Sequence, residues 1–179
     1  MSGTGTGAKR RAAVLFASRF GNTEVVAKAF ERGLKGAGME TTCTRTEDIT
    51  PESLRNFDLI CVGGPTEVFS ATKQVKDFFE RMRGMDLDGK FGFAFDTKLD
   101  SMLSGSAAKY IEHVLDDSGL HLIAPRESAV VTTRKQGGKI VGADLKAGEE
   151  KRFEELGTQV GRATERAFER IGPPSKRQA

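Results

Sequence analysis

The sequence predicts an α/β domain built on an open parallel sheet with helices on both faces. Short apolar runs alternate along the whole chain with stretches whose apolar residues recur at helical spacing. Runs that are apolar throughout are typical of strands buried on both faces, as in a parallel sheet. The length of 179 residues is that of one domain with its own core.

Five strands and four helices are expected along the chain. The first strand is the apolar run 12–17, and the segment 22–37 after it carries one apolar helical face closed by glycines. The threonine-rich segment 39–45 is predicted to be a more exposed second strand. The other strands are expected at 58–62, at 91–95 and within 120–131, where Pro125 interrupts the run, and the other helices at 75–82, 107–115 and 153–167.

The two ends of the chain differ in composition from its body. Residues 1–11 contain three basic residues and no acidic one, and residues 172–179 contain two basic residues. Removing these five charges from the net charge of +3 leaves −2 for residues 12–171. We therefore expect a disordered basic tail at 1–11, a single domain over 12–171 and a second tail at 172–179. The body has no stripe of basic and aromatic residues of the kind that binds nucleic acid.

Several classes of protein are disfavoured by what the sequence lacks. No run approaches the ~18 apolar residues of a membrane span, and the run 12–17 is too short for the apolar part of a secretory signal. We therefore expect a cytoplasmic protein without a membrane span. Cys43 and Cys61 lack CxxC spacing, and His113 and His121 lack partners at ligand spacing, so neither a disulfide framework nor a metal site is predicted.

The polar loop 18–23, between the first strand and the first helix, carries the strongest functional signal. Its backbone N–H groups would lack partners within the helix and would lie at the positive end of the helix dipole. Ser18, Asn22 and Thr23 add side-chain donors, and Gly21 allows a ligand to approach the backbone closely. Open parallel sheets bind ligands at the carboxyl ends of their strands, where this loop lies. We predict phosphate binding here, with simple N-capping of the helix as the alternative.

The segment 14–23, followed by Ala27, resembles the flavodoxin signature of an apolar strand, Ser or Thr, two residues, and then Gly, Asn and Thr. It matches neither the GxGxxG pattern of dinucleotide folds nor the P-loop pattern. The resemblance covers about residues 12–170, and the segment 58–66 is similar to the family's third strand and flavin loop. It implies a doubly wound, five-stranded parallel sheet in the order 2-1-3-4-5, of the short-chain type, with FMN as the cofactor. In that order a strand separates Cys43 from Cys61, so no disulfide is expected between them.

The resemblance also implies which residues contact FMN. The phosphate would be held by Ser18, Arg19, Phe20, Gly21, Asn22 and Thr23. One side of the isoalloxazine ring would meet Pro65, Thr66, Glu67, Val68 and Phe69, and its pyrimidine edge would meet Asp96, Thr97 and Lys98. Three of these have a second interpretation: packing against a helix for Phe69, a surface position for Lys98, and an orientation toward solvent for Arg19.

Three departures from the family pattern bear on the flavin. The chain has no Trp, and its single Tyr, Tyr110, falls inside a predicted helix. No glycine follows Pro65, although many family members have one in this loop. The third departure is Arg19, a bulky cation in a loop that is usually built from small polar residues.

Three functions are compatible with these features. The favoured one is an FMN-binding electron-transfer flavoprotein, with a redox partner docking over the exposed flavin edge. The second is an FMN-dependent NAD(P)H:quinone-type oxidoreductase, and the third is a degenerate flavodoxin-like domain serving as a non-enzymatic interaction module. No catalytic side chain is predicted, so a carrier is favoured over a self-contained enzyme. The sequence carries no signal for the oligomeric state or for a particular partner.

Overall fold

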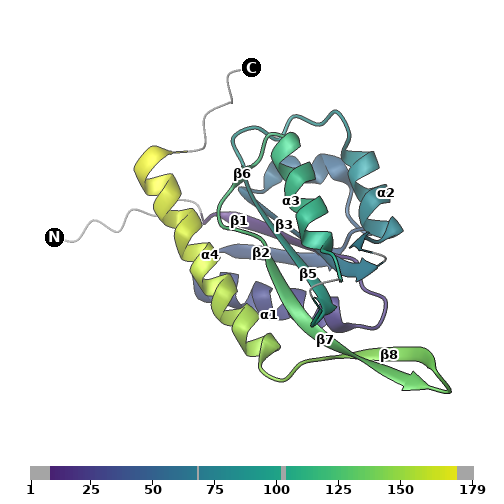
Figure 1. The fold of residues 1–179 in the computed structure, drawn as a ribbon. Helices are drawn as coiled ribbons and strands as arrows, with labels where there is room; N and C mark the ends of the chain where they lie inside the picture. Colours follow the sequence, from purple (N-terminus) through teal and green to yellow (C-terminus); the bar gives the residue numbers. More distant parts are fainter. Residues whose placement is uncertain (1–8, 68, 102–103, 173–179) are drawn as a thin grey trace.

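The structure, a computed structural model, describes residues 9–67, 69–101 and 104–172. A central sheet separates two layers of helices (Figure 1). One face is covered by α1 (Asn22–Gly36) and α4 (Glu149–Ile171), and the other by α2 (Lys73–Met82) and α3 (Ala107–Asp117). A 3-10 helix, Pro51–Asn56, precedes the third strand.

The sheet contains eight strands, of which six lie in the order β2-β1-β3-β5-β7-β8. Their bounds are β1 (Arg11–Phe16), β2 (Glu40–Arg45), β3 (Leu59–Glu67), β5 (Phe91–Leu99), β7 (Glu127–Gln136) and β8 (Lys139–Leu145). Two short strands pair beside this path: β4 (Ser70–Ala71) with β3, and β6 (His121–Leu122) with β5. The first five of the ordered strands pair in parallel, and their order corresponds to the predicted 2-1-3-4-5. The doubly wound α/β class is confirmed.

The predicted number of strands was wrong. The last strand, expected within 120–131, is divided into β6 and β7, with Pro125 between them. In addition, β8 pairs antiparallel with β7 and extends the sheet beyond its parallel part (Figure 1). Gly137 and Gly138 join the two strands with φ of 57° and 77°, the left-handed pair that a two-residue hairpin turn requires.

Helices α1 and α4 cross in close contact on one face of the sheet. A Cβ added to Gly33 would collide with the backbone of Glu154, and one added to Gly157 would collide with the carbonyl of Phe30. The two helices therefore approach so closely that only glycine fits at these positions. This crossing covers the buried phenylalanines beneath it, including Phe30 and Phe153.

The ends of the domain differ slightly from the expected bounds. Strand β1 begins at Arg11, inside the segment 1–11 for which disorder was predicted, and the Arg11 N–H donates to Asp58 at 2.8 Å. Residues 1–8 and 173–179, which hold most of the two predicted tails, lie outside the described residues. None of the helices in the described ranges is both long and apolar enough to cross a membrane.

The two cysteines lie on either side of β1. Val14 is paired with Cys43 of β2 on one side and with Cys61 of β3 on the other. Two strand spacings separate them, roughly 9–10 Å, which is beyond the reach of a disulfide. Both are free thiols. Burial raises the pKa of the Cys43 thiol to about 12 and raises that of Cys61 as well, so both are neutral near pH 7.

Candidate functional site

The loop after β1 and the last residues of β3 and β5 meet at the carboxyl edge of the sheet, and the β7–β8 hairpin closes the far side. They enclose a cavity of about 250 Å³. The cavity is lined by ten of the predicted site residues: Ser18, Arg19, Phe20, Asn22, Thr23, Pro65, Thr66, Glu67, Thr97 and Lys98. Predicted site residues that lie 30 to 80 positions apart in the sequence are therefore brought to one place, as the topology requires.

The remaining four predicted residues do not line this cavity. Gly21 shapes the loop 18–23 without facing the space, and Asp96 is fully buried beneath it. Phe69 lines a different hollow of about 540 Å³ over α3. Val68 lies outside the described residues.

The loop 18–23 leads into α1 so that backbone N–H groups at the start of the helix have no hydrogen-bond acceptor among the described residues. Gly21 has φ of 87°, a left-handed conformation that favours glycine, and its N–H donates to the hydroxyl of Ser18 at 3.1 Å. The first bond of the helix runs from the Val25 N–H to the Gly21 carbonyl. Within the described residues, no acceptor takes the N–H groups of Asn22, Thr23 or Glu24. No side chain caps the helix either, so the N-capping alternative does not describe this loop.

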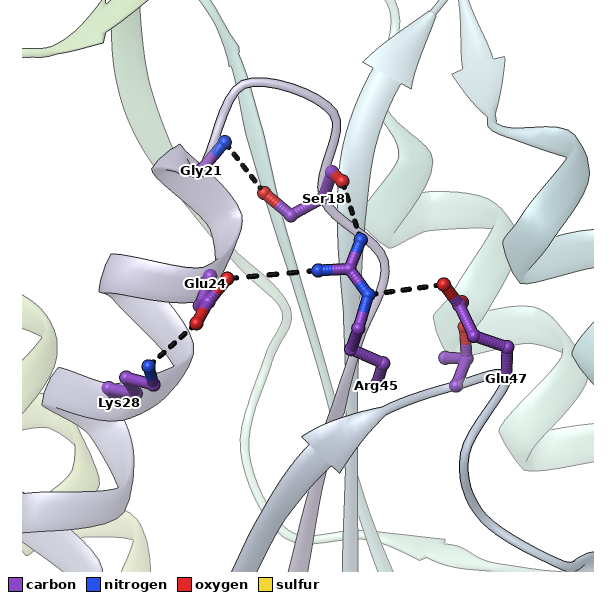
Figure 2. Close-up of polar contacts among 7 residues, drawn as sticks. Ser18, Gly21, Glu24, Lys28, Arg45 and Glu47 are labelled. Carbon is purple, nitrogen blue, oxygen red and sulfur yellow. Dashed lines mark hydrogen bonds and ion pairs between the residues drawn. The ribbon is translucent and has the colours of Figure 1, made fainter.

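Arg45, at the end of β2, contacts the loop 18–23, the first turn of α1 and the residues just after β2 (Figure 2). Its guanidinium donates to the Ser18 carbonyl at 2.9 Å and to Glu47 at 3.1 Å, and it lies 3.7 Å from Glu24 in the first turn of α1. Glu24 also accepts a hydrogen bond of 2.6 Å from Lys28, which holds the pKa of the Glu24 carboxyl below its usual value. The Arg45 side chain thus joins the loop 18–23 to α1 and to the segment that follows β2.

A pair of hydroxyls lies at the inner end of the cavity. Thr23 Oγ1 and Thr97 Oγ1 are 2.8 Å apart, and both residues are buried. One hydroxyl donates to the other, so the pair retains one hydrogen that a bound acceptor can take.

Arg19 points away from the free N–H groups. Its side chain is 67% exposed, and it forms an ion pair of 3.4 Å with Glu67 across the mouth of the cavity. The guanidinium also lies 5.1 Å from the centre of the Phe20 ring. Of the two orientations considered for Arg19, the structure has the one toward solvent.

The buried carboxylate of Asp96 accepts hydrogen bonds from residues beside the cavity. Its Oδ2 accepts hydrogen bonds from the Thr66 hydroxyl at 3.0 Å, from Ser106 at 2.8 Å and from the Ala108 N–H at 2.9 Å. Thr66 in turn accepts from the Ala107 N–H. The carboxylate therefore fixes the start of α3 and the loop after β3. The Oδ2 atom of Asp96 therefore faces α3 and Thr66, and the contact of this residue with the pyrimidine edge stays a prediction.

The backbone at Phe69 explains why its ring is not at the cavity. Phe69 has φ of 67°, is the only described non-glycine residue with positive φ, and forms a bridge with Gly105. Its side chain is 67% exposed, which also excludes the packed alternative.

Sequence reasoning missed five residues that line the cavity: Leu99, Val131, Thr133, Ile140 and Ala143. Leu99 ends β5, and the other four belong to the hairpin. Asn22 is tied to this hairpin, since its amide donates to the Ala143 carbonyl at 2.7 Å. The Gly137-Gly138 pair was the signal that could have revealed the hairpin.

The comparison with known families agrees with this arrangement. The flavodoxin family model matches residues 14–156 of the chain. The chain belongs to the flavodoxin family. The resemblance seen in the loop 18–23 is thereby confirmed.

The curated relatives of this flavodoxin-family chain include both a flavodoxin and an NAD(P)H dehydrogenase (quinone). It is 31% identical over 94 residues to a flavodoxin of Clostridium saccharobutylicum, and 27% identical over 117 residues to an NAD(P)H dehydrogenase (quinone) of Rhizobium johnstonii. These matches span 52% and 54% of the chain, and 58% and 57% of the relatives. The chain thus matches somewhat more than half the length of these curated relatives.

Solved structures agree on the fold. A flavodoxin from the domain Archaea superimposes with a TM-score of 0.69 at 20% identity, covering 87% of this chain and 99% of that one. A flavodoxin 1 from Bacillus cereus gives the same TM-score at 19% identity, covering 84% of this chain and 96% of that one.

Proposed function

We propose that this chain binds FMN in the cavity and serves as an electron carrier. The observation that supports it most is the meeting of free N–H groups at the start of α1 with the Thr23–Thr97 hydroxyl pair. A dianionic phosphate is stabilised by several hydrogen-bond donors, and a helix N-terminus supplies both donors and a favourable dipole.

The donor set fits a phosphate group. The N–H groups of Asn22, Thr23 and Glu24 face outward from the first turn, and the Ser18 hydroxyl keeps its hydrogen while accepting from Gly21. The Asn22 amide is already bonded to the hairpin, so in this proposal its backbone contacts the phosphate and its side chain does not.

The cavity walls fit a flat aromatic ring. Phe20 is 46% exposed and Ile140 is 56% exposed, and both line the cavity from opposite loops. An apolar or aromatic side chain suits a ring face, so these two replace the Trp and Tyr pair that the sequence lacks. The backbone groups of Thr97 and Lys98, at the end of β5, would serve the ring edge, and the Lys98 cation would favour negative charge there. Bound FMN supplies one- and two-electron transfer.

A second candidate is an FMN-dependent NAD(P)H:quinone oxidoreductase. It is favoured by the relative named NAD(P)H dehydrogenase (quinone), which matches this chain at 27% identity. Such an activity would use the same phosphate donors, with a second substrate placed over the ring.

An absorbance experiment separates the candidates. The protein is mixed with FMN, freed of excess flavin by size exclusion, and reduced stepwise with dithionite. A carrier retains FMN, develops an additional absorption band partway through reduction, and is not reduced by NADH or NADPH alone. Rapid reduction by NADPH without another protein would establish the oxidoreductase. Protein that leaves the column without flavin would contradict both and indicate an interaction module.

A further inference from the structure

The β7–β8 hairpin projects from the edge of the sheet (Figure 1), and four of its residues line the cavity. Two of its large apolar side chains are exposed: Ile140 at 56% and Val141 at 52%. Ile140 lines the cavity, and Val141 follows it at the register shift of the hairpin, where the ladder pairs Ile140 and Gly142 with β7 and passes over Val141, so exposed apolar side chains lead from the proposed ring site onto the hairpin. An apolar centre with a charged rim is the usual anatomy of a protein–protein interface.

The charges around this patch are unbalanced. Each of the three acidic residues near it has a basic partner: Glu67 pairs with Arg19, Asp100 with Lys146, and Asp144 with Arg134. The lysines left over, with no ion pair to any described residue, are Lys98, Lys135 and Lys139. One unpaired lysine, Lys98, therefore lines the cavity and two, Lys135 and Lys139, lie on the hairpin, so this part of the surface is positively charged although residues 12–171 as a whole sum to −2.

The pairing in the hairpin places one of these lysines beside the apolar patch. Lys135 lies directly opposite Ile140 in the antiparallel ladder, so the two side chains share a face. Lys139, opposite Gln136, stands at the tip of the same hairpin.

We propose that the β7–β8 hairpin is the docking surface for the redox partner, and that this partner presents an acidic surface with an apolar centre. The proposal rests on the FMN-binding function above. Positive charge at the cavity mouth would steer an acidic protein to the flavin edge and repel a basic one. Ile140 and Val141 would then form the desolvated centre of the contact.

A matched pair of acceptors tests the charge. Cytochrome c is lysine-rich, and succinylation turns its lysines into carboxylates while the haem stays the same. In the test, FMN-loaded protein reduced with dithionite passes one electron to each ferric haem, which becomes ferrous. We expect the succinylated form to react about 3- to 10-fold faster than the native form at low salt, with the preference lost near 0.5 M salt.

Hairpin variants localise the effect. Lys135→Gln/Lys139→Gln is expected to lose most of the preference for the succinylated acceptor while still binding FMN. Val141→Ser should slow both acceptors by about 2- to 5-fold at every salt concentration, since apolar contact is not screened. Arg55→Gln is the control, because Arg55 is exposed, lies in the 3-10 helix at the opposite end of β3, and has no ion-pair partner among the described residues.

Each outcome bears on one proposal. Faster reaction with native cytochrome c, or an equal change in Arg55→Gln and the double lysine variant, would overturn the docking surface. Sedimentation that shows a dimer dissociated by Ile140→Asp would also overturn it, because a second copy would then cover the hairpin. Failure to bind FMN would instead overturn the function on which the inference rests.

Discussion

The side-chain amide of Asn22, at the first position of α1, donates a hydrogen bond of 2.7 Å to the backbone carbonyl of Ala143 in β8. This bond joins the loop 18–23 to a strand 121 residues further along the chain. It closes one side of the cavity, so the order of the hairpin and the shape of the proposed flavin site depend on the same contact.

Replacing Asn22 with alanine should loosen the hairpin. Loss of one hydrogen bond costs about 1 kcal/mol, which corresponds to a roughly 5-fold weaker FMN affinity. Amide hydrogen exchange of residues 139–145 should also become faster in the flavin-free protein. Thr132→Ala is the control, because its hydroxyl makes only an exposed 3.5 Å contact in the same hairpin. Unchanged exchange in Asn22→Ala would show that the bond does not hold the hairpin.

The Thr23–Thr97 pair allows the stability effect and the binding effect to be separated. Thr23→Val leaves the buried Thr97 hydroxyl without its partner and should lower the free energy of unfolding by about 1–3 kcal/mol. Thr23→Val/Thr97→Val removes both hydroxyls and should recover most of that loss, measured by urea unfolding. The affinity for FMN should stay low in the double variant, since the remaining donor hydrogen is gone. Recovery of affinity together with stability would mean that the pair does not contact the phosphate.

Much of the fold could be predicted because its signals are local. Apolar runs such as 12–17 form buried strands, and the stripes on the helices are the faces that pack on them. The hairpin was missed because β8 is mostly exposed and contains one Gly and two charged residues among its seven, so it carries neither a buried run nor clear alternation. Its one local signal, Gly137-Gly138, specifies a turn and leaves open which residues pair around it.

The residues of the candidate site could be predicted where the position of the backbone alone determines that a residue lines the cavity. The loop after β1 and the last residues of β3 and β5 meet because parallel strands end at one edge, which brings in Thr23, Thr66 and Thr97 together. The direction of a side chain depends on three-dimensional neighbours that spacing does not reveal. Asp96 turns toward the N–H of Ala108 in α3, and Arg19 turns toward Glu67.

The crossing of α1 and α4 predicts opposite effects for two glycines of one helix. Gly33→Ala would place a methyl group against the backbone of Glu154 and should destabilise the protein by about 1–3 kcal/mol. Gly36→Ala meets only Thr158 at 4.0 Å and should stabilise it by up to about 1 kcal/mol through helix propensity. Thermal unfolding of the two variants checks the difference. Equal effects would indicate that the helices are free to move apart.

Stability should fall at high pH because burial raises the pKa of both cysteine thiols, and the contribution of Cys43 can be tested by itself. Its pKa is raised to about 12 by burial, so an unfolded chain ionises this thiol near pH 9 while the folded chain keeps the proton. The unfolded state then binds fewer protons, and the free energy of unfolding decreases between about pH 9 and pH 12. The slope from one thiol is at most about 1.4 kcal/mol per pH unit, and less here because Cys43 is partly exposed. Urea unfolding from pH 8 to pH 10.5 measures it, and Cys43→Ala should have a shallower slope than the unsubstituted protein. Identical slopes would assign the loss of stability to other groups.

Arg45 is predicted to control FMN affinity without touching FMN. Its guanidinium holds the Ser18 carbonyl, and Arg45→Met would release the loop that presents the free N–H groups. We expect FMN to bind about 10-fold more weakly, measured by quenching of flavin fluorescence. The free energy of unfolding should change by less than about 1 kcal/mol, because the ion pairs of Arg45 are partly exposed.

A second arginine provides the matched control for this prediction. Arg32 also joins two carboxylates, Glu150 at 2.8 Å and Glu154 at 2.9 Å, but it lies between α1 and α4, away from the loop. Arg32→Met should therefore leave FMN affinity unchanged. Arg45→Lys keeps the charge but lacks the planar fork that reaches the Ser18 carbonyl and both carboxylates, so it should restore affinity only in part. Full restoration of FMN affinity by Arg45→Lys would show that Arg45 contributes positive charge and not its bond to Ser18. An equal loss of FMN affinity in Arg32→Met would show that the effect comes from a general loss of stability.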